Sequence, residues 1–240
     1  MSKKVFEVSW DFITRMKLFS SITPGGFIRR KVNIKNGSES SLMIFSSFKD
    51  VPDECRFPIG SFSSFLSICS LLKKNVIVDY TDFDLGKNII KIKSKDDPNL
   101  TFNYVVADSS VIDDFNSEMD DDIEYDIQGE SNEFNLTSDQ ISFLISAGSK
   151  VDADCIRFFV KKDEMWCELY NTEAPNPHVF SQRILEVDIG HSDEMIIDFN
   201  NFNKLDMTID YNVKVMNSSI AIFSNEVQEI TFLMSNLKSL

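Results

Sequence analysis

One sequence pattern occurs twice in the chain, and its first copy is Arg56-Phe57-Pro58-Ile59-Gly60-Ser61-Phe62-Ser63-Ser64-Phe65-Leu66-Ser67-Ile68. The repeated residues Ile59, Ser61, Phe62, Phe65 and Ile68 return 137 positions later as Ile196, Asp198, Phe199, Phe202 and Leu205. In both copies a β-branched residue precedes a Ser or Asp able to cap a helix, and apolar residues follow at helical spacing. Each copy predicts a strand, a cap and an amphipathic helix. For this pair alone, two ordinary helices that look alike are the alternative.

Further matches, in the same order along both halves, predict an internal duplication. Phe6, Val8, Asp11, Ile13, Met16, Ile28-Arg29 and Val32 precede Phe134, Leu136, Asp139, Ile141, Leu144, Ile156-Arg157 and Val160 by 128 residues. Val78-Asp79-Tyr80 matches Ile209-Asp210-Tyr211, Ile90 and Ile92 match Ile220 and Ile222, and Leu100-Thr101-Phe102 matches Ile230-Thr231-Phe232. We therefore expect two domains of about 105 residues, at 1–107 and 132–240, with a connector at 108–131.

The composition is that of a globular chain with a sizeable core. Of its 240 residues 42% are hydrophobic, and 21 are Phe, which is enough for a core in each half. No apolar run approaches the roughly 18 residues of a membrane span, and the N-terminal residues carry no hydrophobic signal region. We expect a cytoplasmic protein that does not enter a membrane.

Catalytic and metal-binding patterns are weak in this sequence. The four cysteines, Cys55, Cys69, Cys155 and Cys167, lie in apolar segments without metal-ligand spacing, so buried free thiols are favoured over zinc or disulfides. The sequence contains no phosphate-binding glycine loop, nucleophile elbow or H-E-x-x-H motif. The densest carboxylates lie in a polar segment, where no pocket raises a pKa for acid–base work. We expect no catalytic residue, no metal and no cofactor, and hence no enzyme.

The net charge of −14 is concentrated in one segment. Residues 108–130 contain ten acidic residues and no Lys or Arg, and removing these ten charges from −14 leaves −4 for the rest of the chain. Exposed charges separated by more than about 8 Å are largely screened at physiological salt. A basic surface elsewhere is therefore compatible with the acidic total, and the acidic segment itself is expected to be a solvated connector rather than a metal-binding tract.

Periodicity and turn signals give the expected order of elements. The first half predicts helices at 9–19 and 61–74 and strands at 5–8, 27–35, 41–48, 76–82, 88–94 and 100–107, with a further strand ending at Ile59. Asn36-Gly37 predicts a hairpin turn. The second half predicts helices at 138–150 and 198–205 and strands at 134–136, 155–162, 165–171, 178–188, 194–197, 207–216, 218–224 and 227–234. This order predicts an α+β fold with helices on one face of antiparallel sheets, whose edges neighbouring copies could cover in a closed ring.

The segments Phe62–Leu72 with Val76-Ile77-Val78, and Met195–Phe202, resemble the DNA polymerase sliding clamps of T4-type bacteriophages. The resemblance covers the whole chain, although it consists of hydrophobic patterns without catalytic residues. It implies a homotrimeric ring of six similar domains, with helices inside and sheets outside. It further implies that a clamp loader places the ring on duplex DNA, where it tethers the DNA polymerase.

Basic residues on the expected helices are the candidates for contacting DNA. Contacts from Lys and Arg to phosphates are sequence-independent and sensitive to salt, which permits sliding. The candidates are Arg15, Lys17, Lys73, Lys74, Lys150 and Lys204, each of which has a solvated surface charge as its alternative role. Further positive charge is available from Arg29, Arg30 and Lys31 or from Lys91, Lys93 and Lys95, although alternation along a strand allows the last three to face solvent.

The resemblance also implies that peptides of partner proteins dock near the connector. Val111, Ile112 and Phe115 are apolar residues in this acidic segment, so they are candidates either for such a pocket or for covering the domains. Two other classes of protein stay open at this point. One is an acidic, duplicated α+β interaction module that does not bind DNA, and the other is an enzyme with an unrecognised carboxylate site.

Overall fold

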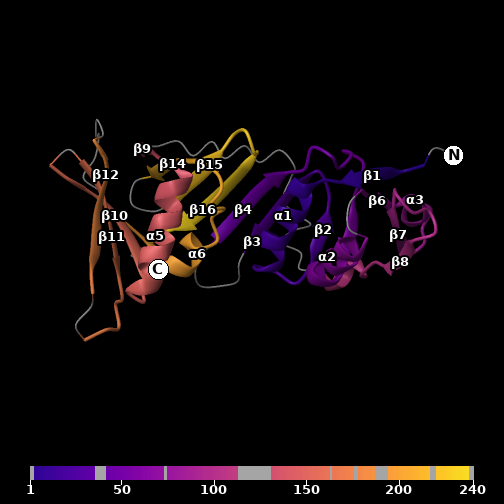
Figure 1. The fold of residues 1–240 in the computed structure, drawn as a ribbon, viewed down its shortest axis with the longest axis horizontal. Coiled ribbons are helices and arrows are strands. Elements are labelled where there is room, and N and C mark those ends of the chain that lie inside the picture. The colour runs from indigo at the N-terminus through magenta and orange to yellow at the C-terminus, as the bar shows by residue number, and fades with distance from the viewer. Residues whose placement is uncertain are drawn as a thin grey trace. The chain divides into compact units, whose positions relative to one another are not determined.

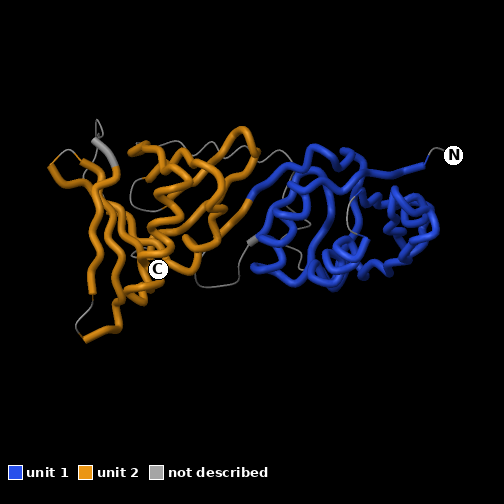
Figure 2. The backbone as a smooth tube through the Cα atoms, viewed as in Figure 1, with its two compact units in different colours: residues 1–35, 45–123 blue, residues 36–44, 124–240 orange. Residues whose placement is uncertain are grey.

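The computed structural model describes residues 3–35, 42–72, 75–112, 131–162, 164–175, 178–186, 194–216 and 220–237. The chain forms two compact units, drawn in blue and orange in Figure 2. Unit 1 comprises residues 1–35 and 45–123, and unit 2 comprises residues 36–44 and 124–240. Each unit has its own buried core.

Unit 1 is built from antiparallel strands and two longer helices (Figure 1). One sheet has the order β1-β6-β7-β8, β2 pairs with β5, and β3 lies next to β4. The helices are α1 (Trp10–Ser20), α2 (Phe62–Leu71) and the short α3 (Thr81–Asp84), and a 3-10 turn, η1, spans Ser109–Val111. The strands are β1 (Val5–Val8), β2 (Gly26–Ile28), β3 (Lys31–Lys35), β4 (Leu42–Ser47), β5 (Phe57–Ile59), β6 (Val76–Asp79), β7 (Ile89–Ser94) and β8 (Thr101–Val105).

Unit 2 has the same plan (Figure 1). Its strands follow the orders β9-β14-β15-β16 and β12-β11-β10-β13. The helices are α5 (Ser138–Lys150) and α6 (Phe199–Phe202). The strands are β9 (Ser131–Leu136), β10 (Cys155–Lys161), β11 (Glu164–Tyr170), β12 (Phe180–Glu186), β13 (Met195–Asp198), β14 (Tyr211–Met216), β15 (Ile220–Asn225) and β16 (Ile230–Ser235).

The strand orders confirm the duplication and the α+β fold. The order β1-β6-β7-β8 of unit 1 repeats as β9-β14-β15-β16, and the pairing of β2 with β5 repeats as that of β10 with β13. The helices pack on the sheets in both units. In unit 1 the ring of Phe65 on α2 lies 5.9 Å from that of Tyr104 on β8, and in unit 2 the ring of Phe202 on α6 lies 5.9 Å from that of Phe223 on β15.

The repeated strand–cap–helix pattern is confirmed in both units. The Ser61 hydroxyl accepts a hydrogen bond from the Ser64 N–H at 3.2 Å, and the Asp198 carboxylate accepts one from the Asn200 N–H at 2.7 Å. These bonds satisfy donors that the first helical turn leaves free. The aromatic residues that follow each cap are buried, namely Phe62 and Phe65 in unit 1 and Phe199 and Phe202 in unit 2.

Strand register corrects two of the sequence matches. Phe6 pairs with Val78 and Phe134 pairs with Val213, so the counterpart of Val78 is Val213 rather than Ile209. Val78 in turn pairs with Ile92, as Val213 does with Phe223. Ile92 therefore matches Phe223 rather than Ile222, because a shift of one residue turns a strand side chain to the opposite face.

The match between Phe102 and Phe232 is confirmed by the same registers. Phe102 pairs with Ile92, and Phe232 pairs with Phe223, which is the counterpart of Ile92. Strand β16 is therefore the counterpart of β8, in the same register that matches β1 with β9.

Several element boundaries differ from the expected ones. The strand expected at 27–35 is divided into β2 and β3, and the helix expected at 198–205 ends at Phe202. The strand expected at 76–82 ends at Asp79, because the Asp79 carboxylate accepts a hydrogen bond from the Thr81 N–H at 3.1 Å and the chain turns into α3. The Asn36-Gly37 turn lies outside the described residues.

The four cysteines are free and buried, as expected. Burial raises the pKa of the Cys55, Cys69, Cys155 and Cys167 thiols to about 12. Burial of a thiol in apolar surroundings disfavours the charged thiolate, which is the nucleophilic and metal-binding form. These residues are therefore part of the packing of the cores.

Candidate nucleic-acid interface

Helix α1 separates an apolar face from an exposed face. The Ser9 hydroxyl caps the helix by accepting a hydrogen bond from the Phe12 N–H at 3.0 Å. The exposed face carries Trp10, whose exposed fraction is 79%, and Lys17. The buried face consists of Phe12, Arg15, Met16 and Phe19, at the i, i+3, i+4 and i+7 positions of one helical stripe. A basic residue on α1 is therefore accessible at position 17 but not at position 15.

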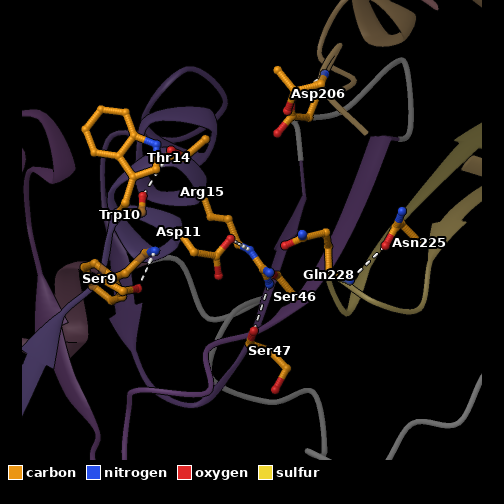
Figure 3. A network of polar contacts seen from close by, with 12 residues as sticks. Ser9, Trp10, Asp11, Thr14, Arg15, Ser46, Ser47, Asp206, Asn225 and Gln228 are labelled. Carbon is orange, nitrogen blue, oxygen red and sulfur yellow. Dashed lines mark hydrogen bonds and ion pairs between the residues drawn. The ribbon is translucent and has the colours of Figure 1, made fainter. Parts of the chain in front are cut away.

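Arg15 is directed into unit 1 (Figure 3). Its Nε lies 3.0 Å from Asp11 Oδ1, and its Nη1 donates to Ser46 Oγ at 2.6 Å and to the Ser47 carbonyl oxygen at 2.8 Å. Only 7% of the residue is exposed. The prediction that Arg15 contacts DNA is therefore corrected: its guanidinium attaches α1 to β4.

The other basic residues of the described helices are more accessible. Lys17 and Lys150 are exposed, and Lys150 is the last residue of α5. Lys204 is half-buried and lies two residues beyond α6. None of the three forms an ion pair with a described residue, so their ammonium groups are available to an external anion. Lys73 and Lys74 lie outside the described residues.

The lysines on β7 and directly after it are bound by carboxylates of the same unit. The Nζ atoms of Lys91, Lys93 and Lys95 lie 2.5, 2.5 and 2.6 Å from carboxylate oxygens of Asp82, Asp79 and Glu7. Hydrogen bonds from Lys87 and Lys91 lower the pKa of Asp82 to about 2. These strand lysines are therefore neutralised locally, and the suggestion that they supply charge for DNA is not supported.

Little further positive charge is accessible in the segment Arg29-Arg30-Lys31. Arg29 is 7% exposed, and Arg30 lies 3.3 Å from an oxygen of Asp53. Lys31 is exposed at the start of β3. Among the candidates in the described part of unit 1, Lys17 is thus the residue that combines exposure with a place on a helix.

The connector candidates divide between core and surface. Ile112 is 5% exposed, whereas Val111, in η1, is 72% exposed. Phe115 lies outside the described residues. Of the two described candidates, Ile112 is therefore buried, and Val111 is the one that a partner can reach.

Two sheet edges carry exposed apolar side chains. Strand β8 is the last strand of its sheet, and Phe102 and Val105 on it are 37% and 69% exposed. Strand β12 is the last strand of its own sheet in unit 2. Beside β12, the ring of Phe143 on α5 lies 5.6 Å from that of Phe180, and Phe143 is 50% exposed. An open edge with adjacent apolar groups is suited to pairing with another strand.

The described part of the chain contains neither a metal-binding cluster nor a membrane-spanning helix. Among these residues, no group of three or more His, Cys, Asp or Glu side chains is arranged to hold a metal ion. Within the same residues, no helix is long and apolar enough to cross a membrane.

Two α+β units with a repeated strand order define the class of fold, and solved structures identify it. No protein-family model and no curated protein sequence matches the chain. The proliferating cellular nuclear antigen (PCNA) of Entamoeba histolytica superimposes with a TM-score of 0.70 at 11% identity, over 97% of this chain and 98% of that one. PCNA of Thermococcus kodakaraensis gives a TM-score of 0.69 at 9% identity, over 97% and 99% of the two chains.

A bacterial structure extends this similarity. The Helicobacter pylori beta clamp bound to a DNA ligase peptide superimposes with a TM-score of 0.63 at 15% identity. The match covers 98% of this chain and 66% of the bacterial one, so the chain spans about two thirds of that clamp. The chain therefore has the sliding-clamp fold.

Proposed function

We propose that the protein is a DNA sliding clamp that encircles duplex DNA and tethers a replicative DNA polymerase. The observation that carries this proposal is the match of nearly the whole chain to nearly the whole of PCNA, which includes both repeated units. In this role residues 1–107 and 132–240 are the two domains, and 108–131 connect them. The activity requires no catalytic group, because a clamp acts by topological attachment.

The proposed contact with DNA is made by lysines on or next to the helices. Lys17, Lys150 and Lys204 are available in the described residues, and Lys73 and Lys74 complete the proposed set. Ammonium groups that meet phosphates without contacting base edges give affinity without sequence preference. This small number of positive charges fits a protein that has to move along the duplex.

Ring closure is proposed to use the β8 and β12 edges. Strand β4, whose residues Leu42–Ile44 belong to unit 2, lies next to β16, at the end of the run β9-β14-β15-β16. In the order of the repeat, β4 corresponds to β12 and β16 corresponds to β8. The same pairing between β12 of one copy and β8 of the next would cover both open edges. Such head-to-tail contacts close when the rotation between copies permits it.

This clamp is proposed to have partners of three kinds. We infer a homotrimer, a clamp loader that opens it, and a polymerase peptide that docks near the exposed Val111. The peptide-bound H. pylori clamp supports a peptide-docking function for this fold. The sequence resemblance supports an origin in a T4-type phage, with the host cytoplasm as the site of action.

The first experiment measures native mass over a concentration series, followed by retention on DNA. A closed trimer has three times the protomer mass of 27.5 kDa, about 82 kDa. A loaded clamp stays on nicked circular DNA and slides off after the circle is cut. Val105→Glu, at the β8 edge, is expected to abolish assembly, whereas Val5→Glu, at the opposite edge of the same sheet, is expected to leave it intact.

The acidic charge favours the second candidate, a protein-interaction module that does not bind DNA. A persistent monomer with equal retention on circular and linear DNA would support that candidate and contradict the clamp. An assembly that leaves the DNA only after linearisation would exclude it.

A further inference from the structure

Trp10 is exposed to an extent that the fold does not require. Its exposed fraction is 79%, and it is the first residue of α1. The corresponding first residue of α5 is Ser138, so an aromatic side chain is not needed to begin this helix in the repeat. Trp combines a large flat apolar ring with a polar N–H group and is enriched where a protein contacts its partners, so an indole ring that contributes little to the core is a candidate for contacting a ligand.

Lys17 places a positive charge beside the Trp10 ring. Thr14 and Arg15 fix the backbone around Trp10 (Figure 3). Lys17 Nζ lies 5.5 Å from the centroid of the indole ring. Thr14 Oγ1 donates a hydrogen bond to the Trp10 carbonyl oxygen at 3.0 Å. The neighbouring Asp11 carboxylate is bound by Arg15, which in turn is held by Ser46 and Ser47 of β4. The buried Arg15 thus both anchors this end of α1 and offsets the negative charge next to Trp10.

We propose that Trp10 and Lys17 form a binding site for an unpaired nucleotide of single-stranded DNA. The indole ring offers a stacking surface for a base, and the Lys17 ammonium group is available to the adjoining phosphate. Bases within a duplex are already stacked on their neighbours, so this site selects nucleotides that are not paired. A site of this kind accepts any base, because every base has a π face.

This site deepens the proposed clamp function, on which it rests. A clamp behind a polymerase encircles duplex DNA close to the point where the template becomes single-stranded. A nucleotide site on a DNA-facing helix would hold the clamp at that junction, whereas lysines alone would let it move along the duplex. A peptide partner is less suited to this position, because Thr14, Lys17, Ser20 and Ser21 make the rest of the exposed face polar.

The chain offers a direct optical test, because it contains only two tryptophans. Trp166→Phe leaves Trp10 as the sole indole and retains an aromatic ring on β11. Titration of this variant with oligothymidylate of about 16 nucleotides at low salt is expected to quench its fluorescence, whereas blunt duplex of the same length is expected to have little effect. Equal quenching by the duplex, or none by either DNA, would overturn the proposal.

Substitutions then measure the contribution of each side chain. Trp10→Ala is expected to weaken binding of fluorescein-labelled oligothymidylate about 5- to 10-fold, and Trp10→Phe less, because the stacking surface is removed or reduced. Lys17→Gln is expected to lower the slope of log K against log salt by about 0.7, the value for one phosphate of a single strand. Val227→Ala is the matched control, since Val227 is also 79% exposed. Unchanged binding by Trp10→Ala would refute the site.

The same variants separate this site from the clamp itself. Trp10→Ala is expected to keep the native mass and the retention on circular DNA of the unsubstituted protein. Failure of assembly and retention in the unsubstituted protein, with quenching preserved, would refute the clamp and leave the nucleotide site standing. Normal retention without quenching would refute the site alone.

Discussion

Helices α1 and α5 occupy equivalent places in the two units but are packed with different residues. Each begins at a capping hydroxyl, that of Ser9 or that of Thr137. The buried stripe of α1 is Phe12, Arg15, Met16 and Phe19, and that of α5, which starts one residue further from its cap, is Ile141, Leu144, Ile145 and Gly148. Both helices thus have a buried stripe with the same i, i+3, i+4, i+7 spacing, whereas each unit fills this stripe with its own residues.

The largest difference in volume is at the last position of the stripe. A Cβ atom on Gly148 would overlap the ring of Phe199 on α6, so glycine is what lets the two helices of unit 2 approach each other. In α1 the last place in the stripe is occupied by the fully buried Phe19. Interiors are packed closely enough that neither arrangement accepts the residue of the other.

Gly148→Phe, which gives α5 the residue of α1, is therefore the substitution with the largest expected effect. Overpacking typically costs about 1–3 kcal/mol, and here a whole ring has no space, so we expect a loss of about 3 kcal/mol or more. Urea denaturation measures this loss. Ser146→Phe, at an exposed position of the same helix, is the control, and equal denaturation midpoints for the two variants would contradict the packing argument.

Arg15→Leu makes the opposite exchange, because it gives α1 the residue of α5. The buried Ser46 hydroxyl loses its donor, while the half-exposed Asp11 can be hydrated, so a destabilisation of about 1–2 kcal/mol is expected. The salt dependence of DNA binding is expected to stay unchanged, because the guanidinium faces the core. A DNA-binding defect in a variant of normal stability would instead return Arg15 to the DNA-contacting set.

The sequence predicts part of the packing of α1 and α5. The apolar residues Phe12, Met16 and Phe19 define a stripe on which position 15 falls, so the burial of Arg15 follows from helical periodicity alone. The acceptors that make this burial tolerable, Ser46 and Ser47, lie 31 and 32 positions away and depend on the tertiary fold. The space around Gly148 likewise depends on Phe199, which is distant in the chain.

The helices and the capping residues are the elements that local sequence predicts best. The helix expected at 138–150 has the bounds of α5, because a capping box of Thr137 and Gln140 marks its start. Strand register is less accessible, since the alternation along Ile90–Ile92 fits two registers of the repeat equally well. Only the pairing of Val78 with Ile92, and of Val213 with Phe223, decides between them.

Removing lysines from the helices is expected to have a moderate effect on DNA binding and little on stability. Lys17→Gln and Lys150→Gln each remove one exposed charge, so each is expected to lower the salt slope of duplex binding by about 0.9 for every phosphate that the variant no longer binds. Lys91→Gln is the matched control, because Asp82 already binds the Lys91 ammonium group. A larger decrease for Lys91→Gln than for the helix variants would reverse the proposed distinction between helix and strand lysines.

The smallest expected effect concerns an ion pair of β7 that has no counterpart in β15. In register, Lys91 of β7 corresponds to Ile222 of β15, so only unit 1 needs the Asp82 carboxylate beside this position. Hydrogen bonds from Lys87 and Lys91 hold the pKa of Asp82 at about 2, below the ordinary value near 4. A lowered pKa in the folded state adds stability above the ordinary pKa, and this contribution disappears as the pH falls from about 4 through 2.

Asp82→Asn tests this contribution at two pH values. The Asp82 side chain is half-buried at the surface of unit 1, where ion pairs contribute little to stability. The substitution is therefore expected to shift the urea midpoint less than Arg15→Leu does at pH 7, and to shift it much less near pH 2 than at pH 7. A shift of equal size at both pH values would mean that Asp82 stabilises unit 1 through packing rather than through its charge.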